Sequence, residues 1–281
     1  MKVWIFSKRT FLTAALCLVL GVFSVIIASS AVGSAVSAAT TPRKIPIYCV
    51  EKQEKIISIS FDAAWGNEDT QQLIDILAKY NIKATFFVVG QWVDKYPASV
   101  KALSDAGHEI ENHSNTHPHM PTLSRGEMLQ EIKTCNDKIE SVTGKRPTLL
   151  RAPYGDYNNA LVDTLQEMNM HCIQWDVDSL DWKNLSSEEI YQRVTSSVKS
   201  GSIVLFHNAA KNTPEALPRI LEKLLSEGYQ FVPISQLIDQ TSYDTDHEGR
   251  QHSCSAPSIN SENAQSIPSA NSMSSINAAS K

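Results

Sequence analysis

The feature that most constrains the fold is the alternation of short apolar runs with longer amphipathic runs between about Lys55 and Ile238. The short runs have the length of buried strands, and in the longer runs apolar residues recur at intervals of three and four, as in helices that pack on a core. This pattern predicts repeated βα units around one parallel sheet or barrel. The expected strands are 56–61, 84–89, 108–111, 149–150, 171–175, 203–206 and 230–232, and the expected helices are 70–80, 97–106, 125–143, 159–168, 188–199 and 214–227.

The N-terminal end of the chain differs from this core. Lys2, Lys8 and Arg9 precede an apolar stretch of about 18 residues, which leads into a small-residue run that ends at Ala38. Residues 1–38 are therefore expected to be a signal peptide or an N-terminal membrane anchor. In both cases the basic flank predicts that the remainder is exported across the cytoplasmic membrane, as a secreted, cell-wall-associated or membrane-anchored protein.

The rest of the chain divides into three parts. Residues 39–54 are expected to be a linker. Residues 55–239 are expected to form a single globular domain, and the protein is expected to be a monomer. Residues 240–281 are rich in Ser, Asn and Ala and are expected to form a disordered tail.

Charge and cysteine content exclude two classes of site. The net charge is −5 and the body has no basic cluster, so no nucleic-acid partner is expected. The five cysteines include no CxxC spacing, which argues against a cysteine zinc site and a disulfide framework.

A histidine pair, His113 and His117, lies in the polar run Glu111-Asn-His-Ser-Asn-Thr-His-Pro-His119. Two imidazoles four residues apart can bind one divalent metal ion. Alone, the pair is equally compatible with a polar loop that caps a helix or faces solvent.

Other polar residues follow the predicted strands at their carboxyl ends. They are Asp62, Asn112 with His113, Arg151, Asp176 with Asp178, and His207. In a parallel barrel these ends converge on one mouth, where active sites form. Each residue alone has an ordinary structural explanation, but their shared position predicts a site.

This set of residues suits water attack on an acyl carbonyl. A metal would polarise water and carbonyl, Asp62 would take the proton of the water, and His207 would protonate the leaving group. Arg151 could orient Asp62, and Asp178 could keep His207 protonated.

Five motifs carry a resemblance to a known family. They are Ser60-Phe61-Asp62, His113-Ser-Asn-Thr-His117-Pro118, Arg151-Ala-Pro-Tyr154-Gly155, Asp178-Ser-Leu-Asp181-Trp182 and Ile203-Val-Leu-Phe-His207-Asn208. In this order they resemble the motifs of the NodB-homology polysaccharide deacetylases, carbohydrate esterase family four. The resemblance implies a distorted (β/α) barrel of about seven parallel strands and metal-dependent removal of N-acetyl groups from an acetylated polysaccharide.

The resemblance also implies a role for each matching residue. Asp62 would be the general base and His207 the general acid, with Arg151 and Asp178 as their respective partners. His113 and His117 would bind a divalent metal, with zinc expected and cobalt or manganese as alternatives. The backbone amide of Tyr154 would stabilise the oxyanion, and Trp182 and Leu205 would wall the pocket for the acetyl methyl group.

One departure from the family pattern concerns the metal. The first motif usually has two consecutive aspartates, the second being a metal ligand, whereas this chain has Ala63 after Asp62. Asp69, Asp176 and His119 are candidates for the missing ligand by proximity in sequence.

The run Phe61-Asp-Ala-Ala-Trp-Gly66 resembles the sporulation (PdaB-like) branch of the family. That branch implies peptidoglycan, including the spore cortex, as the substrate. The alternative is a catalytically weak glycan-binding or structural spore-envelope protein that has lost the third metal ligand.

Overall fold

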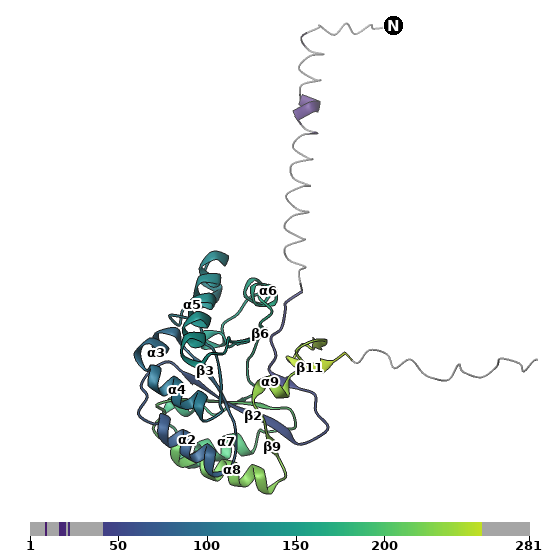
Figure 1. The fold of residues 1–281 in the computed structure, drawn as a ribbon. Coiled ribbons are helices and arrows are strands. Elements are labelled where there is room, and N and C mark those ends of the chain that lie inside the picture. Colours follow the sequence, from purple (N-terminus) through teal and green to yellow (C-terminus); the bar gives the residue numbers. More distant parts are fainter. Residues whose placement is uncertain (1–8, 10–16, 21, 23–41, 255–281) are drawn as a thin grey trace, which may run out of the picture.

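The structure is a computed structural model that describes residue 9, residues 17–20, residue 22 and residues 42–254 (Figure 1). Most of the predicted export segment and residues 255–281 of the predicted tail lie outside the described residues. Within the described part, no helix combines the length and the apolar character that crossing a bilayer requires.

The core of the domain is a parallel sheet with the strand order β6-β5-β4-β3-β2-β8-β7, in which β9 also pairs with the start of β2. The seven strands along this path curl into a half-barrel, so the predicted fold class is confirmed. The strands are β2 (Ile56–Ala63), β3 (Thr85–Val88), β4 (Glu109–Asn112), β5 (Leu149–Leu150), β6 (His171–Cys172), β7 (Val177–Asp178), β8 (Ile203–His207) and β9 (Gln230–Phe231). The sequence pattern missed β7, because it predicts one strand over 171–175, whereas in the structure β6 ends at Cys172 and β7 forms at Val177–Asp178.

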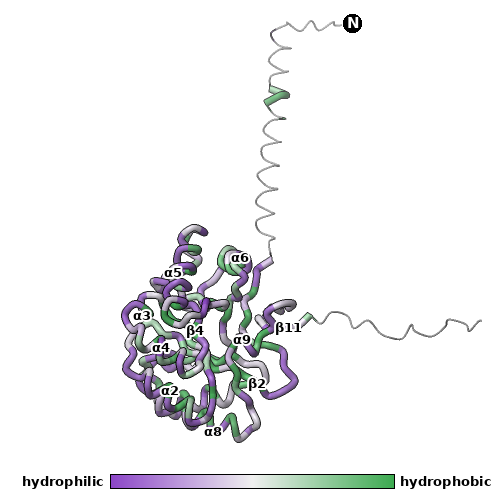
Figure 2. The backbone as a smooth tube through the Cα atoms, viewed as in Figure 1, coloured by the Kyte–Doolittle hydropathy of each residue, from purple (hydrophilic) through white to green (hydrophobic). Residues whose placement is uncertain are grey.

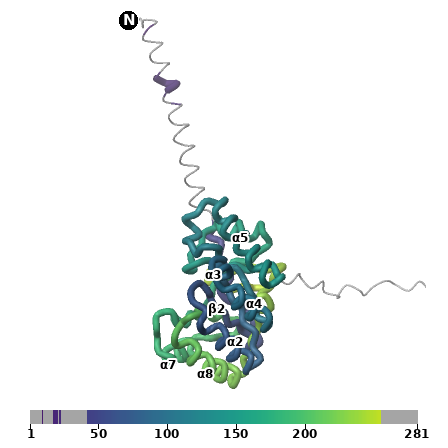
Figure 3. Tube along the Cα trace, turned by 60° about the vertical axis from the view of Figure 1, so that its left-hand side comes forward, coloured from purple at the N-terminus to yellow at the C-terminus, as the bar shows by residue number. Residues whose placement is uncertain are grey.

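Helices cover the outer face of the half-barrel in nearly the order of its strands. Consecutive members of the series α7, α8, α2, α4, α5 and α6 are in contact, and Figure 3 shows α2, α7 and α8 at one end of the domain and α5 towards the other. The helices are α2 (Thr70–Lys79), α3 (Gly90–Lys95), α4 (Pro97–Asp105), α5 (Arg125–Thr143), α6 (Asn159–Glu167), α7 (Ser187–Thr195), α8 (Thr213–Ser226) and α9 (Ile234–Leu237).

The central strand β2 separates an apolar face from a polar face. Ile57, Ile59 and Phe61 alternate along it and pack in the main core under the helices, where Phe61 stacks on aromatic rings from β3 and β8. The alternate residues point into the half-barrel, and among them Ser60 donates a hydrogen bond to a backbone carbonyl of β8. Hydrophobic residues accordingly run along β2 at the centre of the domain (Figure 2). The same alternation brings Asp62 to the inner face at the carboxyl end of the strand.

A small second sheet corrects both predicted domain boundaries. Strand β1 (Cys49–Val50) lies in the predicted linker and pairs in parallel with β11 (Arg250–Ser253), which pairs antiparallel with β10 (Tyr243–Thr245). The predicted start of the disordered tail at Gln240 is therefore wrong. Strand β1 has only two residues and its partner β11 is distant in sequence, while β10 and β11 are short and polar, so the apolar pattern did not show them.

Candidate active site

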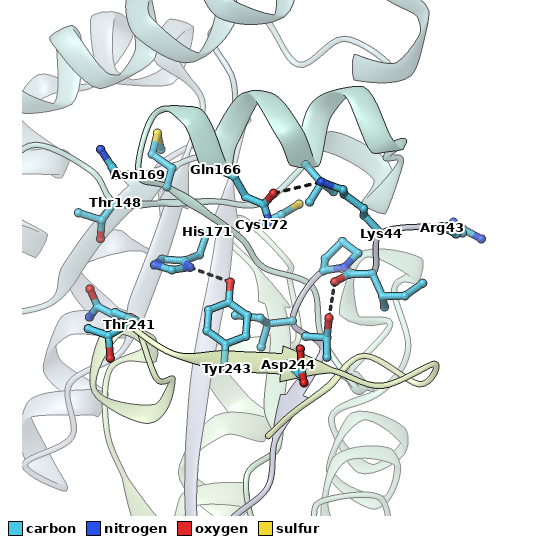
Figure 4. A pocket seen from close by; sticks show the side chains of 17 residues that line it. Arg43, Lys44, Thr148, Gln166, Asn169, His171, Cys172, Thr241, Tyr243 and Asp244 are labelled. Carbon is cyan, nitrogen blue, oxygen red and sulfur yellow. Dashed lines mark hydrogen bonds between the residues drawn. The ribbon is translucent and has the colours of Figure 1, made fainter. Parts of the chain in front are cut away.

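Two cavities of similar size exist in the described part of the chain, and they share no lining residue. One, of about 610 Å³, lies between α6, residues 43–47 and β10, where His171 Nδ1 is 3.0 Å from the hydroxyl of Tyr243 (Figure 4). The other, of about 600 Å³, lies at the carboxyl ends of the barrel strands, and all but one of the predicted site residues line it. The exception is Arg151, which is buried beneath this second cavity.

Asp62 is held as a carboxylate by Arg151. The guanidinium of Arg151 is fully buried and donates from Nη1 to Asp62 Oδ1 at 2.8 Å and from Nη2 to the carbonyl of Gln174 at 3.1 Å. It also lies over the ring of Phe87, 4.2 Å from the centroid, and this contact fixes its plane. Burial opposes the charged form of Asp62, but the charge of Arg151 and its hydrogen bond outweigh burial and lower the pKa of Asp62. The structure therefore brings together the predicted pair of Asp62 and Arg151.

The two histidines of the predicted metal site lie side by side, with ring centroids 5.0 Å apart. His113 Nδ1 is 2.8 Å from the carbonyl oxygen of Arg151, which leaves Nε2 facing Asp62, whose Oδ2 is 3.5 Å away. Burial lowers the pKa of His113, and burial is also the largest cause that lowers the pKa of His117 to about 4. Both rings are therefore neutral at pH 7, as metal ligation requires.

The loop that carries the histidines is fixed by a residue that the sequence analysis missed. The carboxylate of Glu131, on α5, accepts hydrogen bonds from the backbone N–H groups of Asn115 and Thr116 and from the Thr116 hydroxyl, each at 2.8 Å. Ser114 Oγ accepts from the N–H of His117 at 3.0 Å. No spacing in the sequence points to Glu131, because it lies on the polar face of a long helix.

The partner of His207 is Asp181, which corrects the prediction for Asp178. His207 donates from Nδ1 to Asp181 Oδ1 at 2.8 Å, whereas Asp178 accepts from the backbone N–H of Leu180 at 2.9 Å. Asp178 ends β7 and lines the cavity, but the chain then turns through Leu180 at φ 53° and brings Asp181 beneath the imidazole. Burial lowers the pKa of His207, but the hydrogen bond and the charge of Asp181 outweigh it, so the pKa is raised.

Backbone register places the acid and the base beside each other. Asp62 and His207 are paired residues on the neighbouring parallel strands β2 and β8. Both therefore project from the same inner face of the half-barrel into one cavity.

The three predicted substrate-binding residues all line this cavity. Leu205 is buried on β8, two residues before His207, while the side chains of Tyr154 and Trp182 are largely exposed. Tyr154 has a left-handed backbone, with φ 61°, which is costly for a residue with a side chain and is common at functional sites.

The site has two metal ligands, His113 and His117, where the family pattern has three. His117 Nδ1 is buried and has no hydrogen-bond partner in the described part of the chain, so one nitrogen of the pair has an unused lone pair. No group of three His, Cys, Asp or Glu side chains among the described residues is arranged to hold a metal ion. Ala63 is 1% exposed and packs in the main core under the helices. The residues present thus fit a divalent ion held by His113 and His117, with solvent or substrate as its other ligands.

None of the three candidates for the missing ligand lines the cavity with His113 and His117. Asp69 accepts from a backbone N–H of the loop after β8, and Asp176 accepts from the N–H of Ile203 at the other end of that strand. His119 stacks on Tyr154 with the ring centroids 4.2 Å apart. All three side chains are therefore absent from the lining of the cavity that His113 and His117 share.

Comparisons with known proteins agree with this geometry. Residues 50–173 match the polysaccharide deacetylase family. The chain is 38% identical over 188 residues to the peptidoglycan-N-acetylmuramic acid deacetylase PdaC of Bacillus subtilis, a match that covers 67% of this chain and 40% of PdaC. It is 30% identical over 195 residues to PdaA of the same organism, covering 68% of this chain and 74% of PdaA.

A solved structure with a similar fold is that of a carbohydrate esterase family 4 pseudoenzyme from Bacillus anthracis. It is 35% identical with a TM-score of 0.67, and the match covers 69% of each chain. A mutant of that protein with restored enzymatic activity is 36% identical, also with a TM-score of 0.67, and covers 69% of this chain and 71% of that chain. Together with the agreement of motifs and site geometry, these matches show that the chain belongs to the polysaccharide deacetylase family.

Proposed function

We propose that the protein is a hydrolase that removes N-acetyl groups from a cell-wall polysaccharide, with peptidoglycan, including the spore cortex, as its substrate. The observation that carries this proposal is the arrangement of Asp62 and His207. They lie on neighbouring strands that border one cavity. Arg151 holds the first as a carboxylate, and the hydrogen bond and charge of Asp181 raise the pKa of the second. The names of the similar proteins PdaC and PdaA support the choice of substrate.

In the proposed reaction Asp62 removes a proton from water, which attacks the acetamide carbonyl carbon. Asp62 Oδ1 is occupied by Arg151, so Oδ2 is the oxygen that accepts the proton. The new carbon–oxygen bond forms as the carbonyl becomes an oxyanion, to which the backbone N–H of Tyr154 donates a hydrogen bond. His207 then protonates the nitrogen, the carbon–nitrogen bond breaks, and acetate and a free amine result.

His113 and His117 are the residues that would hold the metal, and zinc is the ion we propose, with cobalt or manganese as alternatives. When bound there, a divalent ion supplies Lewis-acid polarisation of the carbonyl and of the water. Trp182 and Leu205 line the cavity, and the acetyl methyl group would pack against them.

A second function is favoured by a specific observation. Ala63 leaves the donor set one carboxylate short, and the similar Bacillus anthracis protein is a pseudoenzyme. A glycan-binding or structural envelope protein with little or no catalysis is therefore the alternative.

We further propose that the domain acts as a monomer outside the cytoplasmic membrane, as a secreted, wall-associated or membrane-anchored protein. The basic residues followed by an apolar stretch at the start of the chain support this location.

The test combines metal binding with acetate release. Zinc is titrated calorimetrically into the full chain and into His113→Ala, and acetate release from peptidoglycan is measured with each candidate metal. Near-stoichiometric zinc binding that His113→Ala abolishes, together with metal-dependent acetate release, is expected. Glycan binding without acetate release under any metal would contradict the enzymatic proposal and favour the alternative.

A further inference from the structure

The mouth of the cavity carries an unusual concentration of exposed aromatic side chains. Between residues 42 and 254 the exposed large hydrophobic side chains are Trp65, Tyr154, Trp182 and Leu225. The first three line the same cavity, and Leu225 lies on α8. Trp65 is the most exposed of the three, at 68%, and the proposed reaction gives it no role.

The backbone around Trp65 is fixed although its indole is in solvent. Asn208 Nδ2 donates to the carbonyl oxygens of Trp65 and Gly66, each at 2.8 Å, and the indole N–H of Trp92 donates to Gly66 O at 2.6 Å. Gly66 has φ 62°, and a Cβ there would lie 2.8 Å from the Cβ of Ala209. The loop is therefore preorganised, which reduces the entropic cost of binding on the indole face.

Trp65 is also close to the proposed reaction centre. Its ring meets that of His117 edge-on with centroids 5.0 Å apart, and His117 meets Tyr154 in the same way at 4.6 Å. Trp65 and Tyr154 thus both contact the ring of His117. A polymer with one residue at the reaction centre would pass its neighbouring residue over one of these rings.

We propose that Trp65 is a stacking platform for a second sugar ring of the glycan, adjacent to the ring that is deacetylated. The C–H groups on the face of a pyranose ring are weakly positive and suit the negative face of an indole, which also gains from covering its apolar surface. This inference rests on the proposed glycan substrate. It makes Trp65 a specificity-determining residue that favours oligomers over single sugars.

The test compares Trp65→Ala with Trp65→Phe, using N-acetylglucosamine and its tetramer as probes. Binding is measured by calorimetry and acetate release by kcat/KM, and Leu225→Ala is the control because its side chain is exposed outside the cavity. Loss of one stacking contact is expected to weaken tetramer binding and to lower kcat/KM for the tetramer about tenfold, mainly through KM. The effect on the monomer should be smaller, and Trp65→Phe should retain part of the preference.

The outcomes separate this inference from the proposed function. A weakened tetramer affinity in Trp65→Ala without acetate release from wild type would support the platform and refute the enzyme. Acetate release from wild type with an unchanged tetramer preference in Trp65→Ala would refute the platform and leave the enzyme. Equal losses on monomer and tetramer, or no binding of either probe by wild type, would overturn the platform. Because the indole is exposed, the melting temperature of Trp65→Ala should stay near that of wild type. This measurement checks that the variant is folded.

Discussion

Replacing Asp181 by asparagine tests the correction that the structure makes to the acid side of the site. The Asp181 carboxylate is 1% exposed and accepts four hydrogen bonds, a set that no other carboxylate in the cavity has among the described residues. The donors are His207 N at 2.9 Å, His207 Nδ1 at 2.8 Å, Thr213 Oγ1 at 2.7 Å and Trp182 N at 2.9 Å.

The magnitude follows from this geometry. Asparagine keeps one acceptor oxygen but places an NH₂ group against two of the four donors, and the charge that stabilises the imidazolium is lost. Breaking a buried charged network costs about 3–5 kcal/mol, which for a domain of this size lowers the melting temperature by roughly 10 °C. Loss of a correctly protonated general acid lowers kcat by about 100-fold at neutral pH.

The pH profile distinguishes this mechanism from simple loss of stability. His207 must be protonated to act as the acid, and Asp181 raises its pKa. Removing the charge lowers that pKa, so the alkaline limb of kcat should move to lower pH in Asp181→Asn. The assay is acetate release from an N-acetylglucosamine oligomer between pH 5 and pH 9 at a temperature where the variant is folded.

Two matched variants complete the test. Thr213→Val removes one donor to Asp181 without touching its charge and should leave the alkaline limb in place. Asp178→Asn should move the limb less than Asp181→Asn, because Asp178 has no hydrogen bond with His207 among the described contacts. A larger shift from Asp178→Asn, or an unchanged limb in Asp181→Asn, would refute the assignment.

Three further predictions concern stability. Arg151→Met should lower the free energy of unfolding by about 3–5 kcal/mol in a denaturant titration, because it leaves Asp62 buried without its partner. If the losses from Arg151→Met and Asp62→Asn added up in the double variant, that result would contradict the pairing. Ala63→Asp, without added metal, should lower the melting temperature by several degrees because it buries a carboxylate in the apolar core, whereas an unchanged value would contradict the packing seen there. The stability that the pair of His207 and Asp181 contributes should be fully present below the unfolded histidine pKa of about 6.5, and it should fall as the pH rises through the higher pKa of the folded state. The free energy of unfolding of wild type minus that of Asp181→Asn should therefore shrink between pH 6 and pH 9. A difference that grows over this range would contradict the prediction.

The helices and most strands of the half-barrel were predictable from sequence, but strand β7 and the small second sheet were not. Helices such as α5 and α8 repeat their apolar pattern over many turns, and their predicted bounds agree with the structure to within about a residue. Strand β7 follows closely on the segment predicted as one strand over 171–175. Strands β10 and β11 are polar, and β1 depends on pairing with β11 near the far end of the described chain.

The site, like the fold, was predictable from sequence only in part. The position of Asp62, His113 and His207 at strand ends follows from the alternation of strands and helices, because the carboxyl ends of parallel strands share one mouth. A left-handed turn at Leu180 decides whether Asp178 or Asp181 reaches His207. Leucine is not a residue type that predicts this conformation. Asp176 was grouped with the mouth, yet it binds the N–H of Ile203 at the opposite end of β8.

The most direct test of the central claim is acetate release from peptidoglycan by the full chain and by Asp62→Asn, measured with zinc at saturating concentration. Asp62→Asn keeps the shape of the side chain and removes its capacity to take a proton, and glycan binding measured in parallel shows whether the cavity is intact. The account predicts metal-dependent acetate release by the wild type and its loss in Asp62→Asn with glycan binding retained. Equal acetate release by both proteins would contradict the role of Asp62, and none from either would contradict the claim that the site is catalytic.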